Sequence, residues 1–357
     1  MTTKQIYISI LTVCIPLLIS VVIMPFIKKI AEHIGAMDIP DARKVHSIPK
    51  PRLGGLGIYI AVLIGIILFV DISNFSNLVL KRIFSILIAS IVIVITGMCD
   101  DIKPLKAKHK LLFQIVSACI VVFYGNLLLD RISIFGLNIN FSYFAYPITI
   151  LFIVACENII NLIDGLDGLA GGICSIFYAS VITICVLTGR TLGFEFIFSL
   201  IMLGSTLGFL VHNFYPSKIF MGDSGSLFLG FTISIISLLG FKTTVVTSIL
   251  IPMAIIAVPI LDTLFAIIRR LLKHQKIFDP DKEHLHHQLL KLNFSHRNTV
   301  LIIYGIDILF AVASILYTLN DTKDIFIGRI IYGLLFIMTL IFVLKTNIIK
   351  ERKHKVK

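Results

Sequence analysis

Long apolar stretches run through the whole chain and are separated by short polar segments. Eleven of them approach or exceed the roughly 20 residues that a helix needs to cross the apolar core of a bilayer. They lie at residues 6–27, 54–70, 82–98, 111–129, 143–157, 169–188, 193–211, 224–240, 245–268, 299–319 and 325–345. The pattern predicts an all-α polytopic integral membrane protein with about 11 transmembrane helices, forming a single membrane-embedded domain over residues 1–357.

The composition agrees with a membrane protein and excludes a soluble one. Hydrophobic residues make up 57% of the chain and charged residues 15%, and the mean hydropathy is +0.98. In a soluble protein the net charge of +12 would point to a nucleic acid, but on this apolar background it favours a membrane surface. We therefore expect no nucleic-acid partner.

The basic residues are distributed unevenly between the two sides of the predicted bundle. Of the 32 Lys and Arg residues, 24 lie in alternate loops, at residues 28–53, 99–110, 269–298 and 345–357 and at Lys218. By the positive-inside rule these loops are cytoplasmic, so we expect the N-terminus outside and the C-terminus inside, with a basic cytoplasmic tail at residues 346–357. Because 14 of the 20 acidic residues lie in or beside the same loops, the active site is expected to be cytoplasmic.

One segment on the opposite side has a strand pattern. Apolar and polar residues alternate from Arg131 to Phe135, and the chain then turns near Gly136 into a second alternating run. This pattern predicts a small external hairpin.

The segment from Asp38 to Gly55 combines three prolines, four Lys or Arg residues and one histidine. Prolines restrict the backbone, so the segment is more ordered than a plain positive-inside loop requires. We interpret it as an anion-binding loop, with His46 and Arg52 as candidate ligands.

An aspartate pair, Asp100 and Asp101, follows the third apolar stretch and precedes three alternating lysines, Lys106, Lys108 and Lys110. Adjacent carboxylates at a membrane edge repel one another unless a cation joins them. The lysines can neutralise the carboxylates or hold phosphate, although a helix end of this composition is also common.

The segment from Asn158 to Gly172 is the most specific in the chain. Asn158, Asn161 and Asp164 recur every three residues, so on a helix they share one side, and Asp167 continues the row. Such groups are expensive in an apolar helix, which favours a functional site over a structural core.

Residues Phe220 to Ser226 form a glycine-containing turn that opens the eighth apolar stretch. The carboxylate of Asp223, the nearby hydroxyls and the free backbone N–H groups would suit a phosphate or a hard cation. Asp and Ser are also good helix caps, so a purely structural role for Ser224 stays open.

The longest cytoplasmic loop carries His284, His286 and His287, with Arg297 behind them. No cysteines accompany these histidines, and their spacing does not place three imidazoles on one helix face, so zinc binding is discounted. The cationic character of the loop favours donors to a pyrophosphate.

A carboxylate also lies within the ninth apolar stretch, at Asp262. Two interpretations stay open. An intramembrane carboxylate is often functional, but this one could equally form a structural ion pair with Arg269 or Arg270.

Together these motifs resemble the polyprenyl-phosphate N-acetylhexosamine-1-phosphate transferase family, which includes the WecA, TagO and MraY enzymes of bacterial envelope synthesis. The resemblance spans nearly the whole chain. It is carried by Asp100-Asp101 with the downstream Lys and Gln114, by NxxNxxDGxDGLAGG at 158–172, by FMGDxGSLxLG at 220–230 and by the HxHH loop from His284. The HxHH form is similar to the WecA and TagO branch, whereas the MraY branch has three consecutive histidines. His109 departs from the family pattern by interrupting the basic stretch.

The resemblance implies transfer of N-acetylglucosamine 1-phosphate from UDP-N-acetylglucosamine to undecaprenyl phosphate, with release of UMP. This would be the first membrane step of envelope polysaccharide or teichoic acid synthesis, in the bacterial cell (inner) membrane. The implied partners are a UDP-sugar, a polyprenyl phosphate lipid and the membrane, with a homodimer left open. The implied cofactor is Mg²⁺, for which Mn²⁺ could substitute, because both substrates are anionic.

The residues and the resemblance together assign roles. Asp223 is expected to be the principal Mg²⁺ ligand, with Asp101 and Asp164 as further ligands. Asp100 is either a base for the lipid phosphate or a nucleophile, and the base is preferred because the second pKa of a phosphate monoester is about 6. The expected catalytic residues are Asp100, Asp101, Asp223 and His284. The expected substrate-binding residues are Asn158, Asn161, Asp164, Asp167, Phe220, Lys106, Lys110, His286, His287, Arg297, His46 and Arg52.

Some of these residues have more specific expected partners. In the family's manner, Phe220 would stack on uracil, and Asn161 and Asp167 would hydrogen-bond the nucleoside. His284, His286 and Arg297 would bind phosphates.

Three other interpretations are weighed against this one. An MraY-like enzyme would use the same chemistry with another UDP-sugar. A secondary transporter would suit eleven helices with an intramembrane Asp262, but transporters place polar groups near the midplane, whereas here they lie at one face without an internal repeat. A lipid-binding scaffold does not explain the many carboxylates, because carboxylates repel phosphates unless a metal intervenes.

Overall fold

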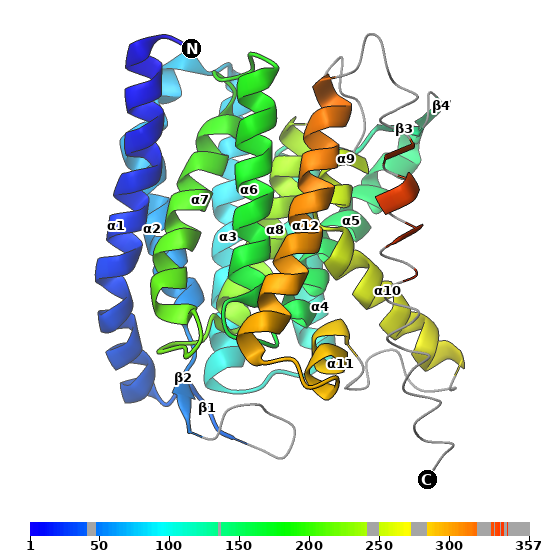
Figure 1. The fold of residues 1–357 in the computed structure, drawn as a ribbon. Helices are drawn as coiled ribbons and strands as arrows, with labels where there is room; N and C mark the ends of the chain where they lie inside the picture. The colour runs from blue at the N-terminus through cyan, green and yellow to red at the C-terminus, as the bar shows by residue number, and fades with distance from the viewer. Residues whose placement is uncertain are drawn as a thin grey trace. The chain divides into compact units, whose positions relative to one another are not determined.

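The computed structural model describes residues 1–40, 48–134, 137–240, 250–272 and 284–319, together with parts of 330–341. The described chain is almost entirely helical (Figure 1). It divides into two compact units, Met1–Ile249 and Leu250–Lys357, which are described separately. The single membrane domain over residues 1–357 stays a prediction, and the basic tail at 346–357 lies outside the described residues.

The first unit is a helical bundle with two small hairpins. Its helices are α1 (Thr3–Ile34), α2 (Gly54–Phe69), α3 (Asn77–Ile102), α4 (Ala107–Cys119), α5 (Ala145–Ile163), α6 (Leu169–Leu187), α7 (Phe194–Asn213) and α8 (Gly222–Gly240), with the short turns η1 (Ile72–Asn74), η2 (Ile120–Tyr124) and η3 (Ser142–Phe144). Strand β1 (Met37–Asp38) pairs with β2 (Lys50–Pro51), and β3 (Arg131–Ile134) pairs with β4 (Leu137–Asn140), all antiparallel. The second pair confirms the expected hairpin, although its turn at 135–136 lies outside the described residues.

The second unit contains α9 (Leu250–Ile255), α10 (Ala257–Leu272), α11 (Leu285–Lys291) and α12 (His296–Leu319) among its described residues. Helices α9, α10 and α11 each contact α12. Helix α11 lies where the sequence analysis expected a loop, and that expectation is wrong. Leu285 and Leu289, one helical turn apart, are both buried and give this short helix an apolar face.

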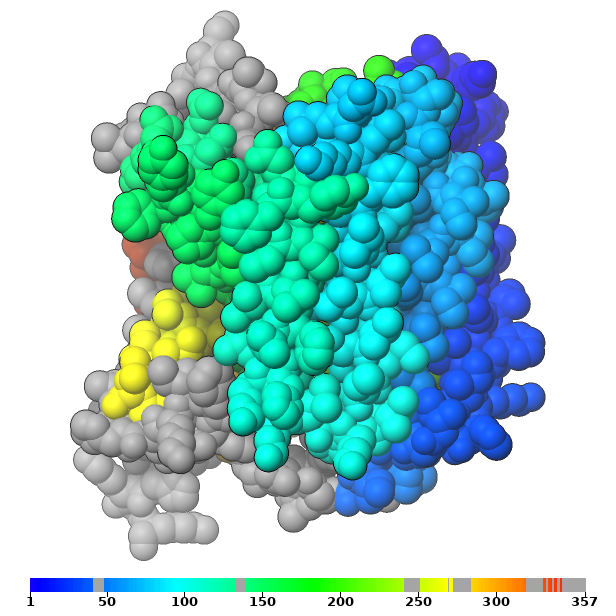
Figure 2. Space-filling view, turned by 180° about the vertical axis from the view of Figure 1, so that it is seen from behind, coloured from blue at the N-terminus to red at the C-terminus, as the bar shows by residue number. Residues whose placement is uncertain are grey.

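Eight helices of the described chain are long and apolar enough to cross a membrane, which confirms the all-α polytopic class. Helices α3 and α4 form much of the face seen in Figure 2. Both helices expose large apolar side chains, among them Phe84, Ile95 and Phe113, as expected for contact with lipid. The last apolar stretch, at 325–345, lies largely outside the described residues.

Two expected helix boundaries are wrong. The apolar stretch at 245–268 is two helices rather than one, because α9 ends at Ile255 and Pro259 has no N–H to donate to the carbonyl four residues before it. Helix α3 runs to Ile102 and so contains the aspartate pair, which was expected after the helix. It stops there because Pro104 disfavours helical backbone at Lys103, which is extended at φ −142° and ψ 114°.

Helix α8 is the core of the first unit. Nearly all its side chains are buried, and α2, α3, α5 and α7 pack against it. A Cβ added to Gly97 of α3 would lie 2.6 Å from the backbone carbonyl carbon of Asp223, and one added to Gly230 would lie 2.5 Å from the carbonyl oxygen of Cys156. Small residues therefore let the backbones of α3 and α5 approach α8 directly.

The close contact between α3 and α8 predicts the effect of one added methyl group. Gly97→Ala should destabilise the protein by about 1–3 kcal/mol, the usual cost of overpacking, because the new Cβ overlaps the backbone of Ser224. The melting temperature of the purified protein in detergent measures this. Gly305→Ala in α12 is the matched control, because a Cβ there meets no atom of the described chain within 4 Å. Equal melting temperatures for the two variants would contradict the packing.

Candidate active site

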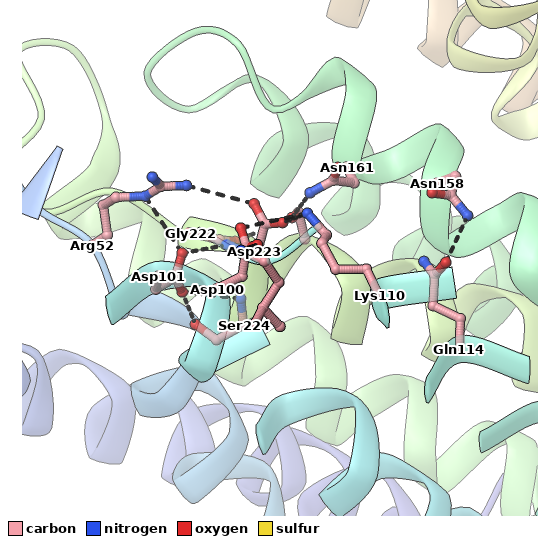
Figure 3. Close-up of polar contacts among 12 residues, drawn as sticks. Arg52, Asp100, Asp101, Lys110, Gln114, Asn158, Asn161, Gly222, Asp223 and Ser224 are labelled. Atoms are coloured by element: carbon pink, nitrogen blue, oxygen red, sulfur yellow. Dashed lines mark hydrogen bonds and ion pairs between the residues drawn. The ribbon is translucent and has the colours of Figure 1, made fainter. Parts of the chain in front are cut away.

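Three carboxylates and two cations meet at one end of α3 and α8 (Figure 3). Asp100 and Asp101 come from the last turn of α3, and Asp223 comes from the first turn of α8. Lys110 reaches them from α4, and Arg52 reaches them from the end of β2. The structure therefore brings together five residues that the sequence assigned to the site.

Asp101 holds the N-terminus of α8. Its Oδ1 accepts the backbone N–H of Asp223 at 2.8 Å, and its Oδ2 accepts the backbone N–H and the hydroxyl of Ser224 at 3.1 and 2.7 Å. The Nε atom of Arg52 lies 3.4 Å from Oδ1, and the carboxylate is fully buried. Asp101 thus satisfies N–H groups that the helix itself leaves unpaired and meets the positive end of its dipole. Its role as a metal ligand stays a prediction.

Gly222 makes this capping contact possible. Its φ of +71° is in the left-handed region, which a side chain disfavours. A Cβ at this position would also lie 2.6 Å from Oδ1 of Asp101. The glycine of the FMGD motif therefore lets the start of α8 turn around the carboxylate.

Asp223 lies between two cations. Its Oδ2 contacts the Lys110 ammonium, and its Oδ1 lies 3.5 Å from Nη2 of Arg52. Lys110 also lies 3.4 Å from Oδ2 of Asp100. Burial alone would lower the pKa of Arg52, but the carboxylates around it, Asp101 first, outweigh burial and raise that pKa above its ordinary value. Each cation is thus shared between carboxylates that would otherwise repel one another.

The donors of this cluster suit a hard divalent cation. Carboxylate oxygens are the ligands that Mg²⁺ prefers, and the Lys110 ammonium already places positive charge between Asp100 and Asp223. In their present geometry, no three His, Cys, Asp or Glu side chains of the described ranges converge as a metal site. A cation bound to Asp223 would therefore take the place that the Lys110 ammonium now holds at this carboxylate.

The row of polar residues on α5 is shorter than expected. Helix α5 ends at Ile163, Asp164 caps its C-terminus, and Gly168 adopts φ +82° just before α6 begins. The expectation that Asp167 continues the row is wrong. The left-handed backbone of Gly168, the second glycine of the DGxDG sequence, lets the chain turn into α6.

The two asparagines of this row tie α5 to its neighbours. Asn161 donates from Nδ2 to the hydroxyl of Ser226 on α8 at 2.8 Å. Asn158 donates from Nδ2 to Oε1 of Gln114 on α4 at 3.2 Å. The asparagines thus connect α5 to α8, which carries Asp223, and to α4, which carries Lys110.

Asp164 lies within electrostatic reach of the cluster. Its partial burial and then the charge of Asp223 raise the pKa of this carboxyl to about 8, although Arg52 opposes the shift. At neutral pH the carboxyl is therefore mostly protonated. Binding a divalent cation through Asp164 would require it to lose that proton.

A second polar cluster forms around Lys50. The ammonium donates to the hydroxyl of Ser217 at 2.7 Å and to Oδ2 of Asp167 at 3.3 Å, and the Ser217 N–H donates to the same carboxylate at 2.9 Å. The ammonium also lies 4.8 Å from the centre of the Phe220 ring. The Phe220 N–H donates to the carbonyl of Pro51 at 2.8 Å. Lys50 therefore links Asp167 and Phe220, which were both expected to bind the nucleoside.

The sequence analysis missed two residues of this region. The first is Lys50, which the sequence did not distinguish from the other cations of residues 38–55. Asn213, at the end of α7, accepts the N–H of Gly168 at its Oδ1 and donates from Nδ2 to the carbonyl of Ile219, both at 2.9 Å. No periodic pattern marks Asn213, and its only signal in the sequence is an amide side chain just after an apolar stretch.

Two expected ligands are not placed with the clusters. Lys106 is exposed at the N-cap of α4, and within the described ranges its ammonium contacts no carboxylate. Of the alternating lysines, Lys110 is the one that contacts Asp100 and Asp223. His46 lies outside the described residues.

The histidine segment belongs to the second unit. His284 is the N-cap of α11, His286 and His287 lie within that helix, and Arg297 is exposed at the start of α12. The side chain of His286 is only 2% exposed. Burial and then the neighbouring histidines hold the pKa of His286 well below its ordinary value, so this ring is neutral at pH 7.

Asp262, on α10, contacts this segment. Its Oδ2 lies 3.0 Å from Nδ1 of His284, and both side chains are buried. The side chain of Arg269, one of the two partners considered from the sequence, lies outside the described residues. The partner that the structure gives to Asp262 is thus a histidine of the HxHH motif.

Comparisons with known proteins identify relatives over most of the chain. Residues 83–241 match the family model described as glycosyl transferase family 4. Over 342 residues the chain is 42% identical to a Bacillus subtilis (strain 168) protein named probable undecaprenyl-phosphate N-acetylglucosaminyl 1-phosphate transferase, covering 95% of this chain and 92% of that protein. It is 33% identical to decaprenyl-phosphate N-acetylglucosaminephosphotransferase of Mycobacterium tuberculosis (strain CDC 1551 / Oshkosh), covering 85% and 82%. It is 29% identical to undecaprenyl-phosphate alpha-N-acetylglucosaminyl 1-phosphate transferase of Escherichia coli (strain K12), covering 78% and 75%.

The capping contact predicts that Asp101→Asn destabilises the protein by about 3 kcal/mol. Both oxygens of Asp101 accept hydrogen bonds, so an asparagine must turn its NH₂ group toward an N–H donor, and it also loses its charge beside Arg52. Thermal unfolding in detergent measures the loss. Asp71→Asn is the control, because Asp71 caps the short turn η1 in an exposed position where water can replace the lost acceptor. A melting temperature for Asp101→Asn no lower than that of the control would contradict the anchoring role.

Proposed function

The chain belongs to the polyprenyl-phosphate N-acetylhexosamine-1-phosphate transferase family, and we propose that it transfers N-acetylglucosamine 1-phosphate from UDP-N-acetylglucosamine to undecaprenyl (polyprenyl) phosphate. The products are UMP and polyprenyl-diphosphate N-acetylglucosamine. The observation that carries this proposal is the cluster of Asp100, Asp223, Lys110 and Arg52 at the ends of apolar helices. Such a cluster suits two anionic substrates, one of them a lipid.

The reaction exchanges one phosphate ester for another. An oxygen of the lipid phosphate attacks the β-phosphorus of the UDP-sugar, and the bond from that phosphorus to the bridging oxygen of UMP breaks. The electron pair of the broken bond stays on the departing UMP. Positive charge near both phosphates is needed because the attacking group, the transferred group and the leaving group are all anionic.

Asp100 is proposed as the base that takes the last proton from the lipid phosphate. Its Oδ1 accepts the N–H of Leu105 at 2.8 Å, which fixes the side chain, while its Oδ2 faces Lys110. Since the second pKa of a phosphate monoester is about 6, little proton affinity is required of this base. Lys110 and Arg52 are proposed to donate hydrogen bonds to phosphate oxygens.

Mg²⁺ is proposed as the cofactor, with Asp223 as its principal ligand and Asp101 and Asp164 as the other assigned carboxylates. When bound, the ion would reduce the repulsion between the substrates and stabilise the charge that develops on UMP. Asp101 also acts through its neighbour, because its contacts fix the backbone of Asp223. Mn²⁺ accepts the same oxygen ligands and is expected to substitute.

The nucleoside is proposed to bind beside Lys50. Phe220 would stack on uracil, and Asp167 would accept a hydrogen bond from the nucleoside. Asn161 would contribute a second polar contact. The phosphates are assigned to His284, His286, His287 and Arg297 of the second unit, and homodimerisation stays a prediction.

The metal assignment predicts that Asp223→Asn lowers transfer by at least about 100-fold. The loss follows because a neutral amide is a poor replacement for a carboxylate beside a divalent cation. The assay counts label moved from UDP-N-acetylglucosamine into undecaprenyl phosphate, beside the UMP released, with and without Mg²⁺. Near-normal turnover of Asp223→Asn at saturating Mg²⁺ would remove the assignment.

The same assay distinguishes this function from its rivals. Asp71 is exposed and lies just before the start of α3, whose last turn carries Asp100 and Asp101, so Asp71→Asn should transfer label at the unmodified rate. Transfer with a different UDP-sugar alone would keep the chemistry and change the donor. Absence of transfer with every UDP-sugar, together with absence of Mg²⁺-dependent UMP binding, would favour a transporter or a scaffold.

The distribution of basic residues predicts the orientation in the bacterial cell (inner) membrane. We propose that the N-terminus lies outside and that the carboxylate cluster and the C-terminus lie in the cytoplasm. Reporter fusions after Arg190, between α6 and α7, and after Lys357 should report opposite sides. If both fusions report the same side, this orientation is wrong.

A further inference from the structure

A buried carboxylate on α10 contacts the start of α11 in the second unit; Figure 1 labels both helices. Oδ2 of Asp262 lies 3.0 Å from Nδ1 of His284, and Oδ1 accepts the backbone N–H of Leu285 at 2.8 Å. The side chains of Asp262 and His284 are 5% and 6% exposed. Each carboxylate oxygen thus has its own partner, one on the helix backbone and one on the imidazole.

The contact to Nδ1 decides the tautomer of His284. A carboxylate accepts hydrogen bonds and donates none, so the proton of the imidazole must lie on Nδ1. The other nitrogen, Nε2, is then the atom that can meet a ligand. Carboxylate–histidine pairs orient metal-bound and catalytic imidazoles in this way.

His284 and His286 of this segment have different surroundings. The rings of His284 and His286 stack with centroids 5.8 Å apart and planes 3° from parallel. His286 is enclosed and neutral, and its ring lies against that of His284. Asp262 is the carboxylate that orients the ring of His284.

We propose that Asp262 is the positioning residue of the HxHH segment. It accepts the Nδ1–H of His284 and caps the start of α11, which leaves Nε2 as the atom that meets the phosphates of the UDP-sugar. In the protonated ring, Nε2–H donates to a phosphate oxygen while Nδ1–H stays on Asp262. This inference rests on the proposed function, in which His284 meets a sugar nucleotide, and it names the residue through which that histidine is oriented.

One substitution separates positioning from a merely structural role. In Asp262→Asn the amide oxygen can keep the hydrogen bond to Leu285, but the NH₂ group then faces Nδ1 of His284. An amide N–H donates, so Nδ1 must become the acceptor and the proton moves to Nε2. The variant thus keeps the shape and the helix cap while it reverses the tautomer.

Nitrogen spectra of protein with ¹⁵N-labelled histidine, in lipid nanodiscs at about pH 9, report the tautomer directly. The signal of His284 is identified by its loss in His284→Gln. We expect a protonated Nδ1 in the unmodified protein and a protonated Nε2 in Asp262→Asn. The matched control is Asp307→Asn, a buried carboxylate of α12 in the same unit, which should leave the His284 signal unchanged.

The transfer assay then connects the tautomer to function. Asp262→Asn should lower transfer about 10- to 100-fold, the usual range for the partner of a functional histidine. In the double variant with His284→Gln, the Asp262 change should cost nothing further, because its effect passes through the imidazole.

Three results would overturn the inference. They are an unchanged His284 tautomer in Asp262→Asn, a reversed tautomer with unmodified transfer, and additive losses in the double variant. Absence of transfer by the unmodified protein would instead contradict the proposed function, while the spectra would still decide whether Asp262 orients His284.

Discussion

The first unit depends on one buried carboxylate that joins two helix ends. Asp101, in the last turn of α3, accepts both the first N–H groups of α8 and the Ser224 hydroxyl. A buried aspartate is costly unless its charge and hydrogen bonds are satisfied, and the N-terminus of α8 together with Arg52 satisfies them. The close approach of α3 and α8 at Gly97 and the left-handed backbone of Gly222 both accompany this contact.

This junction separates the functions of two neighbouring aspartates. Successive side chains on a helix point about 100° apart, so when Asp101 faces α8 its neighbour Asp100 must face elsewhere. Asp101 is fully buried, whereas the carboxylates of Asp100 and Asp223 remain 12% exposed. Lys110 and Arg52 approach these two carboxylates from other parts of the chain, which keeps three acidic groups together at a membrane boundary.

The second unit contains a contact of the same kind. Asp262 of α10 caps the start of α11, much as Asp101 of α3 caps the start of α8. In each case the carboxylate fixes the first turn of another helix and with it a polar side chain, Asp223 on α8 or His284 beside α11. Burial strengthens both contacts, because no water competes for the carboxylate oxygens.

The sequence by itself determined the membrane class, the approximate helices and the identity of the polar motifs, since apolar length and local spacing are properties of short segments. Even the break before Pro259 had a local signal. The sequence did not show which polar residues contact one another, because these contacts are long-range: Asp101 and Asp223 are 122 positions apart, and Lys50 and Asp167 are 117 apart. Only the tertiary structure decided which carboxylate anchors a helix and which stays partly open to solvent, because that choice depends on how two helix ends meet, and no residue spacing along the chain specifies it.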